Sequence, residues 1–568
     1  MNSQKITKLL AALLYHLFLT LKRSNMFVRL KKHPGSKNHS VLICENYREG
    51  KKIHQKIISF LGSSSEPEKL LKLQAEGKAF IEQVKAARAN PIVSTEQNCT
   101  ISLNTYEVTR KNVGIRDTLG RLYDKLGFKR ILRGKKVSKI LKSVVLTRFS
   151  EPSSKRKTCS ILERRFNEEI SSDAVYYMMD QLTKNLTVSQ QMVFKATREA
   201  TGAAIDLALF DVTTLHLETT VQDELRDFGY SKNHKTDATQ VTLALATTKT
   251  GLPIGYRLFP GNTAEVSTLM ECINYWKKTI AIRDIIIIGD RAMMSQDNLL
   301  QLQAAGLKYI IAYPMKKTTK VLKETILSRM NYSKATIKGE AYLKQEINLN
   351  ADEKLVVTFS EKRRVKDAKT REKLISKLKK KLGTSKAAKR LISNRGYLKY
   401  TEIDNKILAQ INEEKVIEDA QWDGLHGILS NTDLSGEEIV ERYKNLWVIE
   451  EAFRINKHNL KMRPIYHYTP DRIKAHIEIC FLTFALIRHA QYRLKHAGLN
   501  ISVDELREEL NPIEASILCD RQTGKFYRMP AQMNFQAREI YKVLGEQKDL
   551  AIQCVDKQEL PANIKLLA

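Results

Sequence analysis

The sequence contains little cysteine, and none of it lies at the spacing of a metal or redox site. Its seven cysteines are scattered at positions 44, 99, 159, 272, 480, 519 and 554, and no two of them form a CxxC pair. This pattern disfavours a disulfide framework and a cysteine-ligated zinc site. It is typical of a protein kept in a reducing cytoplasm.

Long apolar runs are also missing. The longest is LLAALLYHLFLTL, residues 9–21, which is shorter than the roughly 20 residues needed to span a bilayer and is interrupted by His16. It resembles a signal peptide, but KRSN follows in place of a small-residue cleavage site. We interpret residues 1–25 as a leader or an alternative-start extension before Met26. An N-terminal membrane anchor is the alternative.

Acidic residues are too few to balance the basic ones. The chain has 95 Lys and Arg against 63 Asp and Glu, which gives a formal net charge of +32 over 568 residues. Such a charge attracts polyanions, and nucleic acid is the first partner to consider. An anionic membrane surface and a ribosomal role are the alternatives.

The N-terminal part predicts a small β region followed by helices. Residues 26–62 alternate apolar and polar around a Pro-Gly turn, which indicates a β-hairpin. Residues 63–200 have mostly helical periodicity, with basic residues gathered at RFSEPSSKRKT, 148–158. We interpret 63–200 as a helical DNA-binding region, with a plain helical support domain as the alternative.

An α/β sheet is predicted next, over residues 201–315. Strand-like runs lie at 203–218, 239–248, 251–262, 284–290 and 308–314, with helical stretches at about 264–280 and 295–305. Three strands in succession followed by helix, strand, helix and strand indicate a sheet that begins with a meander. The unbroken run DIIIIGD is typical of a central strand buried on both faces.

Residues 316–424 interrupt this order and predict a β-rich, basic insertion. Residues 361–400 contain 16 Lys and Arg against 3 Asp and Glu, so backbone phosphate contact is favoured over a merely solvated helix face. Residues 425–500 then supply the second part of the core. Residues 501–568 are interpreted as a C-terminal helical region.

Two aspartates follow apolar strand runs of the sheet. Asp211 ends IDLALFD and Asp290 ends DIIIIGD. Ligands bind outside the carboxyl ends of strands in open α/β sheets, and neighbouring strands lie about 4.8 Å apart. Two such carboxylates could share an ion, and hard oxygens suit Mg²⁺ or Mn²⁺.

A helix is predicted over YKNLWVIEEAFRINKHNL, residues 443–460. At 100° per residue, Tyr443, Glu450 and Lys457 lie on one stripe beside the buried face, and Glu451 points toward solvent. Glu450 is therefore the expected inward carboxylate. The alternative is a Glu neutralised by a core Arg. Trp447 is expected to pack.

These motifs resemble the DDE transposases of bacterial insertion sequences, in the insertion-sequence-four superfamily and nearest to its sixteen-thirty-four group. That superfamily carries Tyr, Arg, Glu and Lys on its last catalytic helix, and here the positions hold Tyr443, Leu446, Glu450 and Lys457. Arg454, one turn beyond Glu450, could replace the missing Arg. The further likeness covers roughly residues 26–490, in RFSEPSSK, FDVTTLHLE, FGYSKNHKTDATQV, GLPIGYRLFPGNTAE, IGDRAMMSQDNL and LKMRPIYHYTPDRIKAHI.

The resemblance implies a ribonuclease H-like core interrupted by an insertion, with the strand of Asp211 beside that of Asp290. It implies that Asp211, Asp290 and Glu450 hold two divalent ions, Mg²⁺ or Mn²⁺. Tyr443, Lys457 and Arg454 would contact DNA. The partners would be the terminal inverted repeats of the element and target DNA, bound by a homodimer, with no membrane partner.

Smaller expectations concern three further residues. Thr213, two residues past Asp211, could line the site or serve only as a good strand former. Arg291 and His476 could reach phosphate or have structural roles.

Three functions remain open on the sequence. The first is a transposase that cleaves element ends and transfers the strands by two-metal-ion chemistry. The second is a non-catalytic DNA-binding protein derived from a transposase. The third is a metal-dependent nuclease of the same fold without strand transfer.

Overall fold

The computed structural model describes residues 25–32, 38–49, 52–89, 105–202, 205, 207–229, 238–280, 286–290, 295–337, 339–382, 400–404, 408–545 and 552–555. They belong to two compact units, Met1–Thr100 and Ile101–Ala568. The expected leader, residues 1–25, lies outside the described residues except for Asn25.

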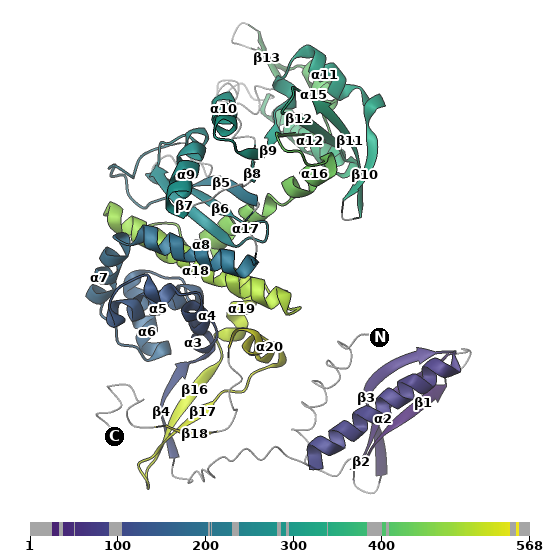
Figure 1. Ribbon diagram of the computed structural model, residues 1–568, viewed down its shortest axis with the longest axis vertical. Helices are drawn as coiled ribbons and strands as arrows, with labels where there is room; N and C mark the ends of the chain where they lie inside the picture. The colour runs from purple at the N-terminus through teal and green to yellow at the C-terminus, as the bar shows by residue number, and fades with distance from the viewer. Residues whose placement is uncertain are drawn as a thin grey trace. The chain divides into compact units, whose positions relative to one another are not determined.

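The described residues of the first unit form a three-stranded antiparallel sheet with one helix packed against it (Figure 1). Its central strand, β2, carries the continuous apolar run from Val41 to Cys44, which is buried. Strands β1 and β2 form the antiparallel pair that the alternation predicts, and β3 adds a strand beyond a simple hairpin. The elements are β1 (Asn25–Lys32), β2 (His39–Glu49), β3 (Lys52–Ser64) and α2 (Pro67–Ala89).

The second unit contains a nine-stranded mixed sheet in the order β10-β11-β12-β15-β9-β8-β5-β6-β7. Strands β5, β6 and β7 form an antiparallel meander, and β8 and β9 then run parallel to β5 on its other side. The periodicity predicted this order of strands and helices. The elements are β5 (Leu207–His216), β6 (Gln240–Thr247), β7 (Pro253–Pro260), α9 (Glu265–Ile280), β8 (Ile286–Gly289), α10 (Gln296–Ala304) and β9 (Lys308–Tyr313).

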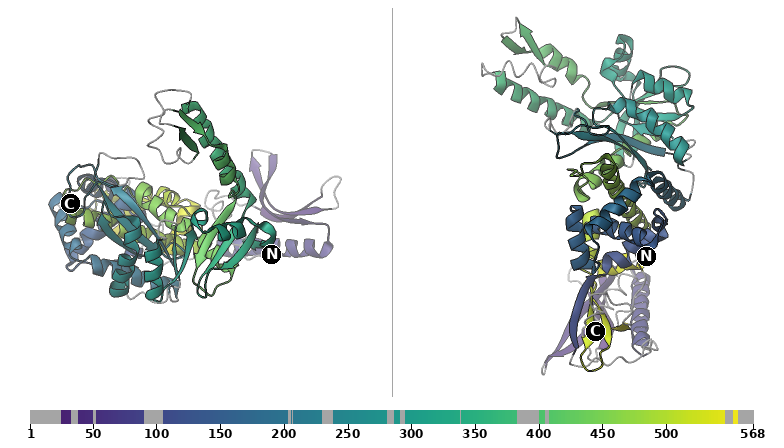
Figure 2. Two further views of the ribbon diagram at one scale, coloured as in Figure 1. Left: turned by 90° about the horizontal axis from the view of Figure 1, so that it is seen from above. Right: turned by 90° about the vertical axis from the view of Figure 1, so that its left-hand side faces the viewer.

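The segment predicted as a β-rich insertion, 316–424, is mixed in structure. Three of its strands extend the main sheet, because β12 pairs with β15 and β15 pairs with β9. Residues 361–382, 400–404 and 408–420 form an arm, drawn in green in Figure 2, in which Leu378 and Tyr400 form a small core. The elements are η3 (Met315–Lys317), α11 (Lys320–Leu327), η4 (Arg329–Asn331), β10 (Ser333–Ile337), β11 (Glu340–Asn348), β12 (Lys354–Phe359), α12 (Glu361–Leu382), β13 (Thr401–Asp404), β14 (Leu408–Ile411), α15 (Glu413–Ala420) and, after the segment, β15 (Leu425–Ser430).

A body of helices packs around α18, most of which is buried. Helices α8 and α18 also contact β7, so the helical body and the sheet share one core. None of the helices in the described ranges is long and apolar enough to cross a membrane. The elements are α3 (Gly114–Asp117), α4 (Leu119–Lys125), η1 (Phe128–Arg130), α5 (Lys135–Ser150), α6 (Lys155–Phe166), α7 (Ser172–Thr183), α8 (Leu186–Thr201) and α18 (Pro470–His496).

The C-terminal region, expected to be helical, also contains strands. Strands β16, β17 and β18 join β4, from the region predicted as helical over 63–200, in a four-stranded antiparallel sheet. The expectation was wrong because this sheet depends on pairing between distant parts of the chain, which local periodicity does not report. The elements are β4 (Thr105–Asn112), α19 (Val503–Leu510), β16 (Glu514–Asp520), β17 (Phe526–Pro530), α20 (Phe535–Leu544) and β18 (Gln553–Val555).

Candidate active site

Two aspartates stand level on neighbouring parallel strands. Leu209 of β5 pairs with Ile288 of β8, so two residues further on Asp211 is level with Asp290. Both side chains lie on the same face, because side chains alternate along a strand, and neighbouring strands are about 4.8 Å apart. Asp290 directly follows β8, as predicted, whereas Asp211 lies in the middle of β5, which continues to His216.

The single helix predicted over 443–460 is three consecutive segments. They are α16 (Gly436–Lys444), α17 (Trp447–Arg454) and the π-helical turn η5 (Ile455–Asn459). Between α16 and α17, the backbone amides of Asn445 and Leu446 bond to the carbonyls three residues earlier instead of four. This change in the hydrogen-bond pattern separates the two helices. Tyr443, Glu450 and Lys457 thus lie on different segments, and the prediction of one regular helix was wrong. π-helical turns occur frequently at functional sites.

The two adjacent glutamates have exposures opposite to those expected. Glu450 is exposed, whereas Glu451 is half-buried and forms ion pairs with Arg488 at 3.3 Å and Arg454 at 3.6 Å. Glu451 therefore stabilises the packing of α17 through its ion pairs, whereas the side chain of Glu450 faces solvent. Trp447, expected to pack, is 59% exposed. The buried face of α17 packs against β5 and β6 and consists of Val448, Ile449, Ala452 and Phe453.

Tyr443 lies near both the sheet carboxylate Asp290 and the helix carboxylate Glu450. Burial, together with the nearby charges of Asp290 and Glu450, raises the pKa of Tyr443 to about 12, although Arg363 opposes the shift. The phenol is therefore neutral at pH 7 and can donate a hydrogen bond. The ring of His426 lies against it, with centroids 5.1 Å apart.

His426, on β15, has no signal in the sequence, because a single histidine within LHGILS is ordinary for a strand. Burial lowers the pKa of its imidazole to about 4, so the ring is neutral at pH 7. It packs beside Tyr443 as an uncharged ring.

Lys457 reaches the strand that carries Asp211. Its Nζ donates a hydrogen bond to Oγ1 of Thr213 and lies 5.7 Å from the centre of the Phe453 ring. Thr213 is buried and is two residues from Asp211, so both point to the same side of β5. The ammonium of Lys457 is thus held on the carboxylate face of the sheet.

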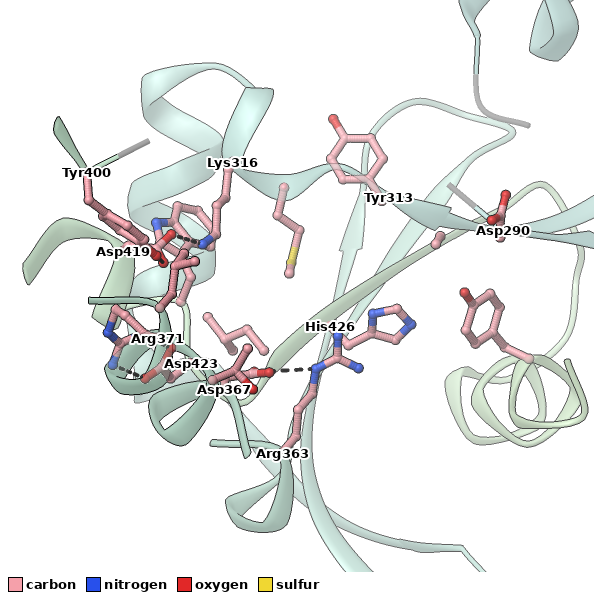
Figure 3. A pocket seen from close by; sticks show the side chains of 17 residues that line it. Asp290, Tyr313, Lys316, Arg363, Asp367, Arg371, Tyr400, Asp419, Asp423 and His426 are labelled. Atoms are coloured by element: carbon pink, nitrogen blue, oxygen red, sulfur yellow. Dashed lines mark hydrogen bonds and ion pairs between the residues drawn. The ribbon is translucent and has the colours of Figure 1, made fainter. Parts of the chain in front are cut away.

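A cavity of about 680 Å³ extends from Asp290 and Tyr443 toward the arm. Figure 3 shows Asp290 at one end and the Arg371–Asp423 pair at the other, with His426 and Arg363 between them. The two oxygens of Asp423 accept hydrogen bonds from Arg371 at 2.5 Å. The cavity therefore joins the predicted carboxylate site to α12.

The basic segment 361–400 is described only in part. Helix α12 presents most of its Lys and Arg side chains to solvent, and residues 383–399 lie outside the described residues, as does Arg291. The exposed lysines of α12 fit the predicted phosphate contacts, because each can reach a phosphate without breaking the core.

The acidic residues supply oxygen donors suited to a hard cation. Asp211 and Asp290 stand together by register, and Glu450 lies near Tyr443, as Asp290 does. Within the described ranges, no three His, Cys, Asp or Glu side chains are close enough to hold one ion. The two aspartates therefore fit a shared cation better than the complete triad does.

The family model described as Transposase DDE domain matches residues 202–486, half of the chain. The chain belongs to this family. The match begins at the end of α8 and continues into α18, so this transposase domain includes Asp211, Asp290 and Glu450. No curated protein sequence matches the chain.

Two solved transposase structures resemble the chain. The piggyBac transposase synaptic complex with hairpin DNA shares 10% identity over 70% of this chain and 76% of that one, with a TM-score of 0.37. The Mos1 transposase paired-end complex with left transposon end shares 10% identity over 41% of this chain and 66% of that one, with a TM-score of 0.14.

Proposed function

We propose that the protein is an insertion-sequence transposase that binds the ends of its element, cleaves the DNA strands there and transfers them to target DNA. The observation that carries this proposal is the family match over the segment in which Asp211 and Asp290 stand level on neighbouring strands. Assignment to the insertion-sequence-four superfamily and its sixteen-thirty-four group rests on the motifs alone. The meander followed by two strands parallel to β5 supports a ribonuclease H-like core.

Asp211, Asp290 and Glu450 are the proposed ligands of two Mg²⁺ or Mn²⁺ ions. Such ions would activate a water or a 3′-hydroxyl and stabilise the leaving oxygen of the phosphodiester. Glu450 is exposed on α17, beside the phenol of Tyr443 that also neighbours Asp290. Its approach to the two aspartates on DNA docking is part of the proposal.

Tyr443, Lys457 and Arg454 are the proposed DNA contacts near the scissile phosphate. The neutral phenol of Tyr443 would donate a hydrogen bond to a phosphate oxygen, and Lys457 would act as a point charge. Arg454 is exposed on α17 and would exchange its ion pair with Glu451 for a phosphate.

The proposed partners are duplex DNA carrying the terminal inverted repeats and target DNA, held by two copies of the chain. The net charge of +32 supports tight, salt-dependent binding to such polyanions. We place the protein in the bacterial cytoplasm, at the nucleoid.

Cleavage of a labelled duplex that carries the genomic repeats flanking the element tests the proposal. With Mg²⁺ or Mn²⁺, the wild type should nick the duplex at the repeat end. Asp290→Asn and Glu450→Gln should each slow cleavage by about 100-fold or more, because metal ligands support several kcal/mol of transition-state stabilisation. Both variants should bind the duplex nearly as well as the wild type.

Glu441→Gln is the matched control, because it removes an exposed carboxylate from α16 and should leave cleavage unchanged. Binding without metal-dependent nicking by the wild type would indicate a non-catalytic DNA-binding protein. Nicking without joining of the 3′ end to a second duplex would indicate a nuclease. Wild-type activity in Asp290→Asn or Glu450→Gln would refute the site.

A further inference from the structure

The basic motif at 148–158 contains two basic side chains that do not face solvent. Arg148 on α5 is 5% exposed and Lys155 on α6 is 3% exposed, whereas Lys157, also on α6, is exposed. No ion pair found among the described residues joins Arg148 or Lys155 to a carboxylate. Burial, together with the nearby charge of Arg148, lowers the pKa of Lys155 well below its ordinary value. Buried polar groups are hydrogen-bonded in proteins, so the donors of both side chains need acceptors inside the protein.

Lys155 acts on a backbone carbonyl through His476. Its Nζ lies 3.2 Å from Nδ1 of His476, whose Nε2 lies 3.1 Å from the carbonyl oxygen of Met462. A carbonyl oxygen can only accept, so Nε2 carries the proton and Nδ1 accepts from Lys155. His476, considered as a phosphate contact from sequence, is buried and fully occupied by this chain of hydrogen bonds.

Arg148 and Arg507 contact the same segment from the helical body. Nη1 of Arg148 lies 3.5 Å from the carbonyl oxygen of Leu460, and Nη2 of Arg507 lies 2.8 Å from that of Asn459. Arg507 also donates to the carbonyl of Phe149 at 2.7 Å. Basic groups thus reach the carbonyls of 459, 460 and 462.

Residues Asn459–Met462 need side-chain hydrogen-bond donors, because they end the helical segment that carries Lys457. The last carbonyls of a helix have no partner within it, and cations near that end complement its dipole. Lys461 has a φ of 46°, which is uncommon for a residue with a side chain. Two residues before Asn459, Lys457 is bonded to Thr213 on the strand of Asp211.

We infer that Arg148 and Lys155 are positioning residues, which fix the segment Asn459–Met462 and thereby hold Lys457 on the carboxylate face of the sheet. The role in cleavage rests on the proposed transposase function. The motif thus acts from inside the protein and couples the helical body to the active site. The surface residues around it remain available for DNA.

Hydrogen–deuterium exchange of the full-length chain tests the positioning without any need for activity. Lys155→Met keeps the aliphatic stem and removes the donors, so amides in 455–462 should exchange about 10-fold faster or more, with β5 unchanged. Lys157→Met is the matched control and should leave these amides at wild-type rates. Unchanged exchange of 455–462 in Lys155→Met overturns the inference.

Single-turnover cleavage at saturating DNA gives the second readout. Lys155→Met should lower the cleavage rate at least 10-fold with less than a twofold change in DNA affinity, and His476→Gln, which keeps a donor for Met462, should retain more activity than His476→Leu. In a Lys457→Met background, Lys155→Met should add little further loss, because both act through one ammonium.

A fully additive loss in that double variant overturns the inference, as does wild-type cleavage by Lys155→Met. If Lys155→Met fails to fold, His476→Gln and His476→Leu decide through the same exchange and cleavage measurements. Absence of cleavage by the wild type would refute the proposed function, and the exchange experiment alone would then judge the positioning.

Discussion

Glu478 is a fully buried carboxyl group at the centre of α18. Its two oxygens accept hydrogen bonds from Ser189 at 2.6 Å and Tyr256 at 2.7 Å. Burial outweighs these bonds and raises the pKa of Glu478 from 4.5 to about 7. We predict that this group makes the stability of the protein fall as the pH rises from about 4.5 to 7.

The sign follows from the order in which the two states lose the proton. The unfolded chain ionises Glu478 near pH 4.5, whereas the folded protein keeps it protonated until about pH 7. In that window the folded state binds more protons, so the free energy of unfolding decreases as pH rises. A shift of about 2.5 pKa units corresponds to about 3 kcal/mol in full, and to about 2.5 kcal/mol between pH 5 and pH 8.

Urea unfolding of the wild type and Glu478→Gln, followed by tryptophan fluorescence at pH 5, 6, 7 and 8, measures this effect. The variant cannot ionise, so its stability relative to the wild type should rise by about 2.5 kcal/mol from pH 5 to pH 8. Exposed Glu441→Gln should show no such trend. If the difference in the free energy of unfolding between the wild type and Glu478→Gln stays constant across these pH values, the reasoning is refuted.

Two further predictions concern α12. Three of its exposed lysines are Lys366, Lys369 and Lys373. Replacing all three with Gln should reduce the magnitude of the slope of log K against log salt concentration by up to about 3 in a titration of DNA binding. An unchanged slope would mean that this helix does not contact phosphate. Arg371→Met leaves Asp423 buried without its cation, so unfolding of the arm should become easier by about 3 kcal/mol. The buried Trp422 beside it reports this transition by fluorescence, and an unshifted midpoint would contradict the stabilising role of the pair.

The order of the sheet could be predicted because each of its first strands is encoded locally. Runs such as DIIIIGD are typical of central strands, and the intervening helices have clear periodicity. The placement of Asp211 beside Asp290 came from the family resemblance, and the strand pairing agrees with it. The roles of these residues stay predictions.

The course of the helical segment could not be predicted. Neither Gly nor Pro marks the interruption at Asn445 and Leu446. The π-helical turn contacts α18 and α19, and its Lys457 bonds to Thr213, so its partners are distant in sequence. The wheel geometry that placed Glu450 inward assumed a regular helix. Glu451 is instead half-buried and paired with Arg488, which lies on α18, a later helix of the chain.

The burial of Arg148 and Lys155 could not be predicted for a related reason. A run of basic residues normally indicates a solvated surface. Here Arg148 donates to a backbone carbonyl of the segment Asn459–Met462, and Lys155 reaches that segment through His476. This segment lies some 300 residues later in the chain. Only the tertiary structure brings donors and acceptors together.

Strand β15 lies between β9 and β12, hydrogen-bonded to both, and leads directly into α16. The chain that continues from β15 into α16 and α17, with Glu450, is therefore anchored to residues 316–424, which precede it. A variant of the protein lacking residues 316–424 would expose one side of β15 as an unpaired edge strand, which favours aggregation. Truncation would thus impair solubility, and residues 316–424 cannot be treated as a detachable module in protein engineering.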